Sequence, residues 1–363
     1  MPTRSRSTGA PVAVDVGAPP AAAPSPPPAV ASRRSRVYTA CPVCHDTFRT
    51  GFVRCPRDGA TMLLADRDPL SWAVLDDRYL VGRRLAEGGV ARVYRGRRLA
   101  DGAPVAIKIP FGDAALVSST MVRFDREARL GRRVRHRNVV GVLDDGATPG
   151  GLRYLVMELA GGPPLRAMID RVHALPATWI VGMVGQIAEG LRHLHGRGLV
   201  HRDLKPGNVL IEARPGGGAR VRIVDLGNAV AVGAGDGGGR ATAAGQIFGT
   251  PEYVAPEQLH HGPIGPHTDL FTLGLVLWEL LAGVRPFDGD ALEVARHNAG
   301  APWPRVRDRA PGRPVDPLLE ALARWLLHRE PERRPASAGE VVAILREIAH
   351  DRDRARARLA AWR

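Results

Sequence analysis

The spacing of apolar and polar residues differs from one segment of the chain to the next, and it predicts where strands and helices lie. Short apolar runs bounded by polar or turn residues are typical of strands. We expect strands at 78–81, 105–108, 136–140, 154–158 and 221–224. Segments 120–135 and 176–197 instead place apolar side chains three or four positions apart, which predicts helices. Another strongly apolar helix is expected from Thr268 through Leu281, too short to span a bilayer.

The part of the chain before residue 78 lacks this regular pattern. Residues 1–37 consist largely of Pro, Ala, Ser and Arg with few large apolar side chains, which predicts a disordered leader. Residues 38–65 hold all three cysteines, and residues 66–77 are predicted to form a linker.

Two short knuckles within residues 38–65 carry potential metal ligands. The sequence of the first is Cys41-Pro-Val-Cys44-His45, and that of the second is Cys55-Pro-Arg-Asp58-Gly59. Together they resemble a zinc ribbon whose fourth cysteine is replaced by an aspartate. Tetrahedral zinc accepts thiolate and carboxylate ligands, so we expect a Zn²⁺ site. The expected ligands are Cys41, Cys44, Cys55 and Asp58, with His45 as a rival fourth ligand. The alternative is three unmetallated thiols, although so short a segment has little core without a metal.

Composition and charge narrow the classes of function. The chain has 363 residues, 44% of them hydrophobic, and a formal net charge of +14. Arginines are scattered rather than clustered, so we expect no nucleic-acid partner. The only lysines are Lys108 and Lys205, and a compact ammonium is not interchangeable with a guanidinium. No apolar run is long enough to span a membrane, and the proline-rich start lacks a signal peptide's apolar core, which predicts a cytoplasmic protein.

Residues 201–208, with the sequence HRDLKPGN, gather several kinds of polar chemistry between two apolar runs. The flanking runs are strand-like, so the octamer must be a turn whose polar groups converge. It offers the carboxylate of Asp203, the ammonium of Lys205 and the amide of Asn208. Phosphoryl transfer needs a base for the attacking hydroxyl, a cation near the phosphate and an oxygen ligand for magnesium. The octamer resembles the catalytic loop of bacterial eukaryotic-like (Hanks-type) serine/threonine protein kinases, H-R-D-L-x-x-x-N.

The resemblance covers residues 78–349 and implies an α+β, two-lobed protein-kinase fold. A small antiparallel β lobe with one helix would occupy residues 78–158, and a large, mainly helical lobe residues 161–349. ATP would bind between the lobes. Residues 350–363 would then be a basic C-terminal tail.

Motifs in their expected order imply catalytic roles by the same resemblance. Lys108, in the run VAIK, would hold the ATP phosphates and pair with Glu127. Asp225, in the run DLG, would hold Mg²⁺ together with Asn208. Asp203 would orient the substrate hydroxyl and accept its proton. The expected catalytic set is Lys108, Glu127, Asp203, Lys205, Asn208, Asp225 and Thr250, with Lys205 steadying the γ-phosphoryl and Thr250 positioning the acceptor.

The segment AEGGVARV at 86–93 resembles the glycine-rich loop of kinases, G-x-G-x-x-G-x-V. Ala86 and Ala91 replace the first and third glycines. Alanine is small enough for the backbone to approach phosphate, but it loses easy access to positive φ. The residues expected to contact ATP are Leu85, Ala86, Glu87, Gly88, Gly89, Val93, Ala106, Lys108, Met157, Glu158, Ala160 and Leu210.

The segment FGTPEYVAPE at 248–257 is similar to the end of a kinase activation segment. Between Gly227 and Thr250 the only hydroxyl side chain is that of Thr242, so we hypothesise that Thr242 is an activating phosphosite. Arg202 could bind its phosphate. An unmodified loop is the alternative.

Two further acidic residues are expected to have structural roles by resemblance. Asp269 would support the backbone of the catalytic loop, and Glu257 would pair with Arg334.

These motifs predict a protein serine/threonine kinase that uses ATP and Mg²⁺, acts on Ser and Thr of proteins and phosphorylates itself, with a homodimer as one way to do so. One alternative is a pseudokinase that serves as a scaffold, which Ala86, Ala91 and Leu226 would favour. Another is a zinc-ribbon nucleic-acid-binding protein, which only the net charge and the incomplete knuckle pair support.

Overall fold

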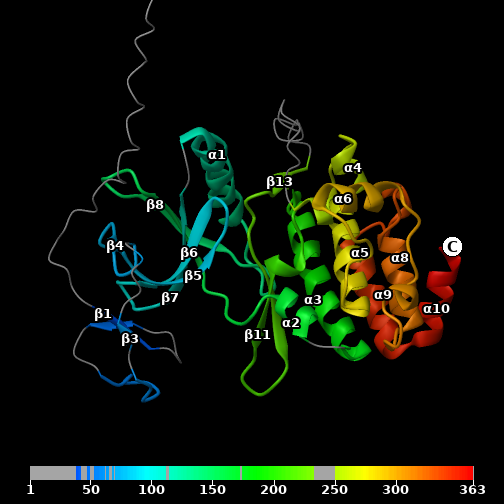
Figure 1. Cartoon of the computed structure of the whole chain (residues 1–363), viewed down its shortest axis with the longest axis horizontal. Helices are drawn as coiled ribbons and strands as arrows, with labels where there is room; N and C mark the ends of the chain where they lie inside the picture. The colour runs from blue at the N-terminus through cyan, green and yellow to red at the C-terminus, as the bar shows by residue number, and fades with distance from the viewer. Residues whose placement is uncertain are drawn as a thin grey trace, which may run out of the picture. The chain divides into compact units, whose positions relative to one another are not determined.

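A six-stranded antiparallel sheet is the main element of the smaller of two lobes in the computed structural model of the chain (Figure 1). The model describes residues 38–41, 47–49, 53–61, 63–64, 68, 70–111, 114–171, 174–232 and 250–362. The strand order is β4-β5-β6-β7-β9-β8. The bounds are β4 Val74–Leu75, β5 Tyr79–Glu87, β6 Ala91–Arg98, β7 Pro104–Pro110, β8 Val142–Ala147 and β9 Arg153–Glu158.

The two faces of this sheet bury different side chains, because successive residues of a strand point to opposite faces. On one face, Tyr94, Ile107 and Tyr154 are fully buried in a core of their own. On the other face, Leu155 packs against Phe124 of helix α1, which spans Ala114–Gly131. The sheet and α1 together make the small lobe.

The large lobe is mainly helical. Its helices are α2 Leu165–Arg171, α3 Ala177–His195, α4 Pro256–Leu259, α5 Pro266–Ala282, α6 Ala291–Gly300, α7 Val306–Arg309, α8 Pro317–Leu326, α9 Ala338–His350 and α10 Arg352–Ala361. Every residue of α5 from Thr268 to Ala282 is buried, because α3 and α8 pack against it. Among the described residues, no helix is both long and apolar enough to cross a membrane.

The large lobe also contains short strands and 3₁₀ turns, some of them next to the predicted catalytic loop. They are β10 Leu199–Val200 paired with β13 Val230–Ala231, β11 Val209–Ala213 paired with β12 Ala219–Ile223, and the turns η1 Pro206–Asn208, η2 Pro251–Tyr253 and η3 Pro331–Arg333. The loop thus leaves β10 and enters the β11–β12 hairpin. The predicted α+β organisation, a small antiparallel β lobe with one helix and a large helical lobe, is confirmed.

Two expectations from the sequence differ from the structure. The strand expected at 136–140 is a turn, and the edge strand β8 begins at Val142 instead. Asn138 accounts for the turn, because its fully buried side-chain amide donates to the Val221 carbonyl at 2.9 Å. Residues 352–361, expected as part of a basic tail, form α10, whose Ala355 and Leu359 are buried in the core of the large lobe.

The described part of residues 38–64 contains a separate small sheet. Its strands are β1 Tyr38–Ala40, β2 Thr47–Arg49 and β3 Leu63–Leu64, in the order β2-β1-β3. Both pairs are antiparallel. Cys41 directly follows β1, so this sheet positions the first predicted zinc ligand.

Candidate active site

A buried carboxylate holds the catalytic loop in shape. Asp269, fully buried near the start of α5, accepts hydrogen bonds from the backbone amides of His201 and Arg202 at 2.8 and 2.9 Å. His195 Nε2 lies 2.8 Å from the same carboxylate. Although burial alone would raise it, these hydrogen bonds keep the pKa of Asp269 below its usual value. The support matters because Arg202 has φ +67°, a left-handed conformation that is costly for a residue with a side chain.

Asp203 lies within this loop with its carboxylate nearly buried, at 5% exposure. Its Oδ2 accepts hydrogen bonds from Lys205 Nζ at 3.0 Å and Asn208 Nδ2 at 3.3 Å. Its Oδ1 accepts from the Thr250 amide at 3.2 Å, and Lys205 Nζ also donates to the Thr250 hydroxyl. This one carboxylate therefore accepts hydrogen bonds from an ammonium, a side-chain amide and a backbone amide, an arrangement in which a carboxylate could serve as a base.

The strand period explains how Lys108 reaches its partners. Lys108 is paired with Leu155 across the β7–β9 ladder, so the two side chains share the face of the sheet that α1 covers. On α1, Glu127 adjoins the helix stripe that packs on Leu155. Lys108 Nζ donates to Glu127 Oε2 at 2.7 Å and to Asp225 Oδ1 at 2.9 Å. This single ammonium links the small lobe to the strand end that carries Asp225.

Electrostatics favour the ionised forms of Lys108 and Asp225, whereas burial raises the pKa of Glu127 despite its pairing with Lys108. Burial alone would lower the pKa of Lys108, but the charges of Glu127 and Asp225 outweigh it and raise the pKa above its usual value. The nearby ammonium of Lys108 lowers the pKa of Asp225 to about 2. Lys108 is therefore a cation and Asp225 an anion at neutral pH, as phosphate and magnesium binding would require.

The two residues after Asp225 fix its position. Leu226 is 3% exposed and belongs to the core of the large lobe, so it anchors the segment as a buried apolar side chain. At Gly227 a Cβ atom would lie 3.1 Å from Asp225 Oδ1 and 3.3 Å from Glu127 Oε2. A methyl group here would therefore displace at least one of the two carboxylates by a few tenths of an ångström.

The turn between β5 and β6 departs from the glycine-rich pattern without visible strain. Ala86 pairs with Val93 in the strand ladder, and Gly88 N donates to the Ala91 carbonyl at 2.9 Å. None of residues 86–91 has a positive φ. Positive φ is what alanine resists, so the two alanines fit this backbone conformation.

Comparison with known proteins agrees with this geometry. The family model described as "Protein kinase domain" matches residues 79–345. The chain belongs to the protein kinase family. It is 37% identical over 286 residues to the serine/threonine-protein kinase PknL of Mycobacterium tuberculosis (strain ATCC 25618 / H37Rv), covering 78% of this chain and 69% of that protein.

Two other relatives are longer than this chain. The chain is 32% identical over 295 residues to the serine/threonine-protein kinase pkn3 of Myxococcus xanthus, covering 81% of this chain and 54% of pkn3. It is 34% identical over 286 residues to PknA of Mycobacterium tuberculosis (strain ATCC 25177 / H37Ra), covering 77% and 63%. The chain thus spans about half the length of pkn3.

The predicted adenine-contacting segment of the kinase domain lies at the end of β9. Met157 pairs with Ala106, and Glu158 pairs with Val105, across the β7–β9 ladder. The Glu158 amide donates to the Gly141 carbonyl at 3.0 Å, so this amide is already paired within the protein. The other predicted nucleotide contacts are spread along the chain: Leu85, Ala86 and Glu87 on β5, Gly88 and Gly89 in the β5–β6 turn, Val93 on β6, Ala160 after β9 and Leu210 on β11.

A salt bridge ties the end of the activation segment to the large lobe. Arg334 donates from both terminal nitrogens to the two carboxylate oxygens of Glu257, each at 2.8 Å. Both side chains are buried, with exposures of 4% and 6%. Despite burial, this pairing lowers the pKa of Glu257. A bidentate arginine–carboxylate pair gives geometric precision as well as attraction.

One buried polar cluster beside the activation segment was not predicted from the sequence. Tyr253 donates to Glu279 Oε1 at 2.6 Å, and Arg166 Nη2 donates to the Tyr253 hydroxyl at 2.8 Å and also pairs with Glu279. Burial raises the pKa of Glu279. The sequence did contain a sign of this cluster, because Glu279 is a lone glutamate late in an otherwise apolar helix, and a buried carboxylate needs a partner.

The structure brings together three of the four predicted zinc ligands. The potential ligand atoms of Cys41, Cys55 and Asp58 all lie within 4.8 Å of one another. Cys41 Sγ donates to the Asp58 carboxylate at 3.1 and 3.3 Å, and both cysteines are buried. Cys44, the rival ligand His45, and the predicted phosphosite Thr242 lie outside the described residues.

Proposed function

We propose that the protein is a serine/threonine protein kinase that transfers the γ-phosphoryl group of ATP to Ser and Thr hydroxyls of proteins, including its own. The observation that carries this proposal is the contact of Lys108 with both Glu127 and Asp225. Phosphoryl transfer in this family needs the lysine–glutamate ion pair, and it needs the aspartate that would hold Mg²⁺ to be in place. The serine/threonine specificity is suggested by Lys205 and by the names of the relatives, which are serine/threonine-protein kinases.

The residues present suit magnesium binding. Asn208 Nδ2 donates to the Asp203 carbonyl at 2.8 Å, and this bond directs its Oδ1 elsewhere. Within the described structure, that oxygen has no recorded hydrogen-bond partner. Asn208 and Asp225 would therefore offer the oxygen ligands that this hard cation prefers. When bound, the ion would neutralise charge that develops on the transferred phosphoryl group.

We assign the remaining steps to side chains of this chain. Lys108 binds the α- and β-phosphates, and Asp203 orients the acceptor hydroxyl and accepts its proton as the new O–P bond forms and ADP leaves. Lys205 offsets charge on the γ-phosphoryl group. Thr250, whose hydroxyl Lys205 contacts, positions the acceptor segment.

The test is transfer of labelled phosphate from ATP with magnesium to the full chain and to a generic protein acceptor, followed by phosphoamino-acid analysis. Label on phosphoserine or phosphothreonine is expected. Nucleotide binding without any transfer would favour the pseudokinase alternative. Label on tyrosine alone would contradict the proposed specificity.

We also propose that residues 38–65 bind one Zn²⁺ through Cys41, Cys55, Asp58 and Cys44, with His45 as the rival for the fourth position. Two buried thiols and an exposed carboxylate this close together suit a structural zinc site. The metal content of the purified full chain tests this: about one zinc per chain is expected, and less after Cys55→Ser. Zinc-free protein with unchanged thermal stability would contradict the site.

The predicted phosphosite Thr242, the homodimer for autophosphorylation, the cytoplasmic location and the predicted domain limits remain proposals that rest on the sequence. Phosphopeptide mapping after incubation with ATP tests the phosphosite. Phosphate found only at other residues would contradict it.

A further inference from the structure

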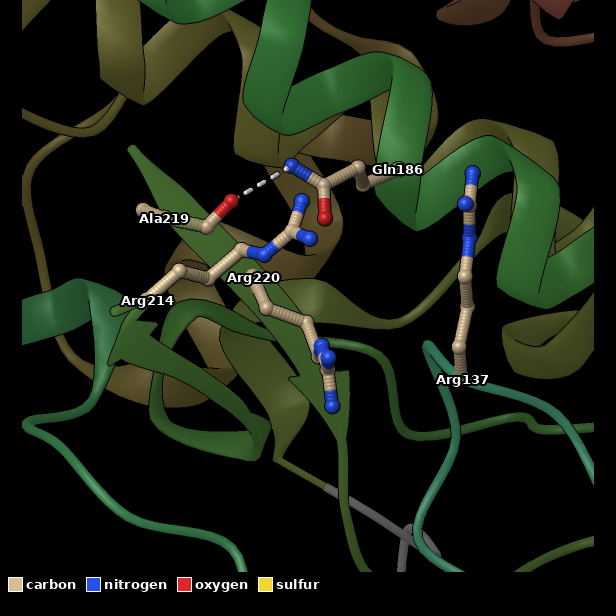
Figure 2. Close-up of a pocket in the computed structure, with 5 residues that line it drawn as sticks. All are labelled: Arg137, Gln186, Arg214, Ala219 and Arg220. Carbon is tan, nitrogen blue, oxygen red and sulfur yellow. Dashed lines mark hydrogen bonds between the residues drawn. The ribbon is translucent and has the colours of Figure 1, made fainter. Parts of the chain in front are cut away.

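A small basic pocket lies on the large lobe between α3, the β11–β12 hairpin and the turn that follows α1. Figure 2 shows the residues that line it: Arg137, Gln186, Arg214, Ala219 and Arg220. Its volume is about 130 Å³. Three of these residues carry a guanidinium group and none carries a carboxylate. None of them belongs to the proposed active site.

Hydrogen bonds join the three elements that form the pocket. Gln186 Oε1 accepts from the Val221 amide at 3.0 Å and from Asn138 Nδ2 at 3.1 Å. Gln186 Nε2 donates to the Ala219 carbonyl at 3.2 Å, the bond drawn in Figure 2. Asn138 is fully buried and adjoins Arg137 in sequence. The backbone positions that carry the arginines are thus fixed in advance of any ligand.

The hairpin turn brings two of the arginines together. Residues 214–218 have the sequence RPGGG, and Gly216, Gly217 and Gly218 all have positive φ. The Arg214 amide donates to the Gly218 carbonyl at 3.1 Å, which closes the turn. Arg214 directly follows β11 and Arg220 lies on β12, so both line the hollow from the end of one tight hairpin, and Figure 2 shows their guanidinium groups pointing in different directions.

The positive charge of the pocket is poorly balanced. Within the described structure Arg137 and Arg214 form no recorded ion pair, and Arg220 Nη1 approaches Glu212 Oε2 only at 4.0 Å. Guanidinium groups around one hollow repel one another unless an anion lies between them. Arg137 and Arg214 are exposed, so an anion can reach them from solution.

The size and charge of the pocket narrow the class of ligand. Pockets for small molecules measure roughly 300–1,000 Å³, so this one fits a single anionic group. A carboxylate matches one guanidinium fork, whereas a phosphoryl group with three terminal oxygens can accept from several. We propose that the pocket binds the phosphoryl group of a phosphoserine or phosphothreonine on a partner protein segment. The protein source rests on the proposed kinase function; the preference for phosphate does not.

Calorimetric titration of the full chain tests this with four probes: the peptide Ala-Ala-phosphothreonine-Ala-Ala, the same peptide with threonine, the same peptide with glutamate, and inorganic phosphate. The phosphopeptide is expected to bind at least about tenfold more tightly than the others. The double variant Arg137→Gln/Arg214→Gln should weaken it roughly tenfold or more. The matched control, Arg296→Gln/Arg307→Gln, removes the same charge at exposed sites outside the pocket.

The outcomes separate the alternatives. Equal binding of the glutamate peptide would overturn the preference for phosphate, and equal binding of inorganic phosphate would overturn the protein partner. No binding, or equal loss in the control variant, would overturn the pocket. Binding requires no phosphate transfer, so a kinase that is inactive in the labelling assay could still pass this test, and an active one could fail it.

Discussion

The catalytic loop and the β5–β6 turn both face the proposed nucleotide site, yet they relate to the kinase pattern in opposite ways. The loop matches the pattern and is held by the buried carboxylate of Asp269. The turn lacks two of three expected glycines, but its backbone uses no positive φ. The difference teaches that a residue whose charge takes part in phosphoryl transfer cannot be replaced by another residue type. A glycine can be replaced by alanine where the backbone does not adopt positive φ.

The largest effect is expected for Lys108→Arg, which keeps the positive charge but changes the shape of the group that carries it. The Lys108 side chain is only 15% exposed, and a planar guanidinium cannot replace its ammonium in contacting Glu127 and Asp225 at once. We expect the rate of phosphate transfer to fall by about 10²–10³. Arg307→Lys, at an exposed position, is the control. A loss smaller than about tenfold would show that charge alone suffices.

The second variant, Asp269→Asn, removes the support of the catalytic loop. Asparagine keeps one acceptor oxygen, so the amide of His201 or Arg202 is left without its partner. We expect the free energy of unfolding to fall by about 2–4 kcal/mol and transfer by about 10². Denaturant titration and initial rates measure the two effects. The control, Asp353→Asn at an exposed position, should lower neither the free energy of unfolding nor the transfer rate. Normal activity in Asp269→Asn would rule out the supporting role.

Gly227→Ala should have an intermediate effect, because here a glycine is needed for space. The added methyl group would press on the carboxylates of Asp225 and Glu127. We expect a roughly tenfold loss of transfer rate. The control is Gly182→Ala on α3, where a Cβ atom would meet nothing within 4 Å. Equal rates for both variants would contradict the tight approach.

The smallest effect is expected where the turn departs from the pattern. Restoring glycine with Ala86→Gly and Ala91→Gly should change ATP affinity by less than about threefold, because positive φ is not used. Each change should cost roughly 0.5–1 kcal/mol of stability, since both residues lie in strands. Nucleotide titration and thermal denaturation check this. A large gain in affinity would mean that the alanines do impair the turn.

Local patterns and ordered motifs predicted the fold and most of the proposed site, whereas contacts between distant segments were less visible. Lys108, Asp203 and Asp225 could be located because their motifs have fixed neighbours. The turn at 136–140 could not, because it depends on a hydrogen bond between Asn138 and the distant Val221 carbonyl. Likewise, α10 is polar in sequence but buries Ala355 and Leu359 in the core of the large lobe.

Asp203→Asn tests the proposed mechanism most directly when nucleotide binding and phosphate transfer are measured on the same preparation. If Asp203 is a catalytic base that does not hold the nucleotide, the ATP dissociation constant of Asp203→Asn should lie within about twofold of that of the wild type. The same role predicts a transfer rate lower by about 10²–10⁴. Transfer that persists in Asp203→Asn would contradict the assignment of Asp203 and the proposed function built on it.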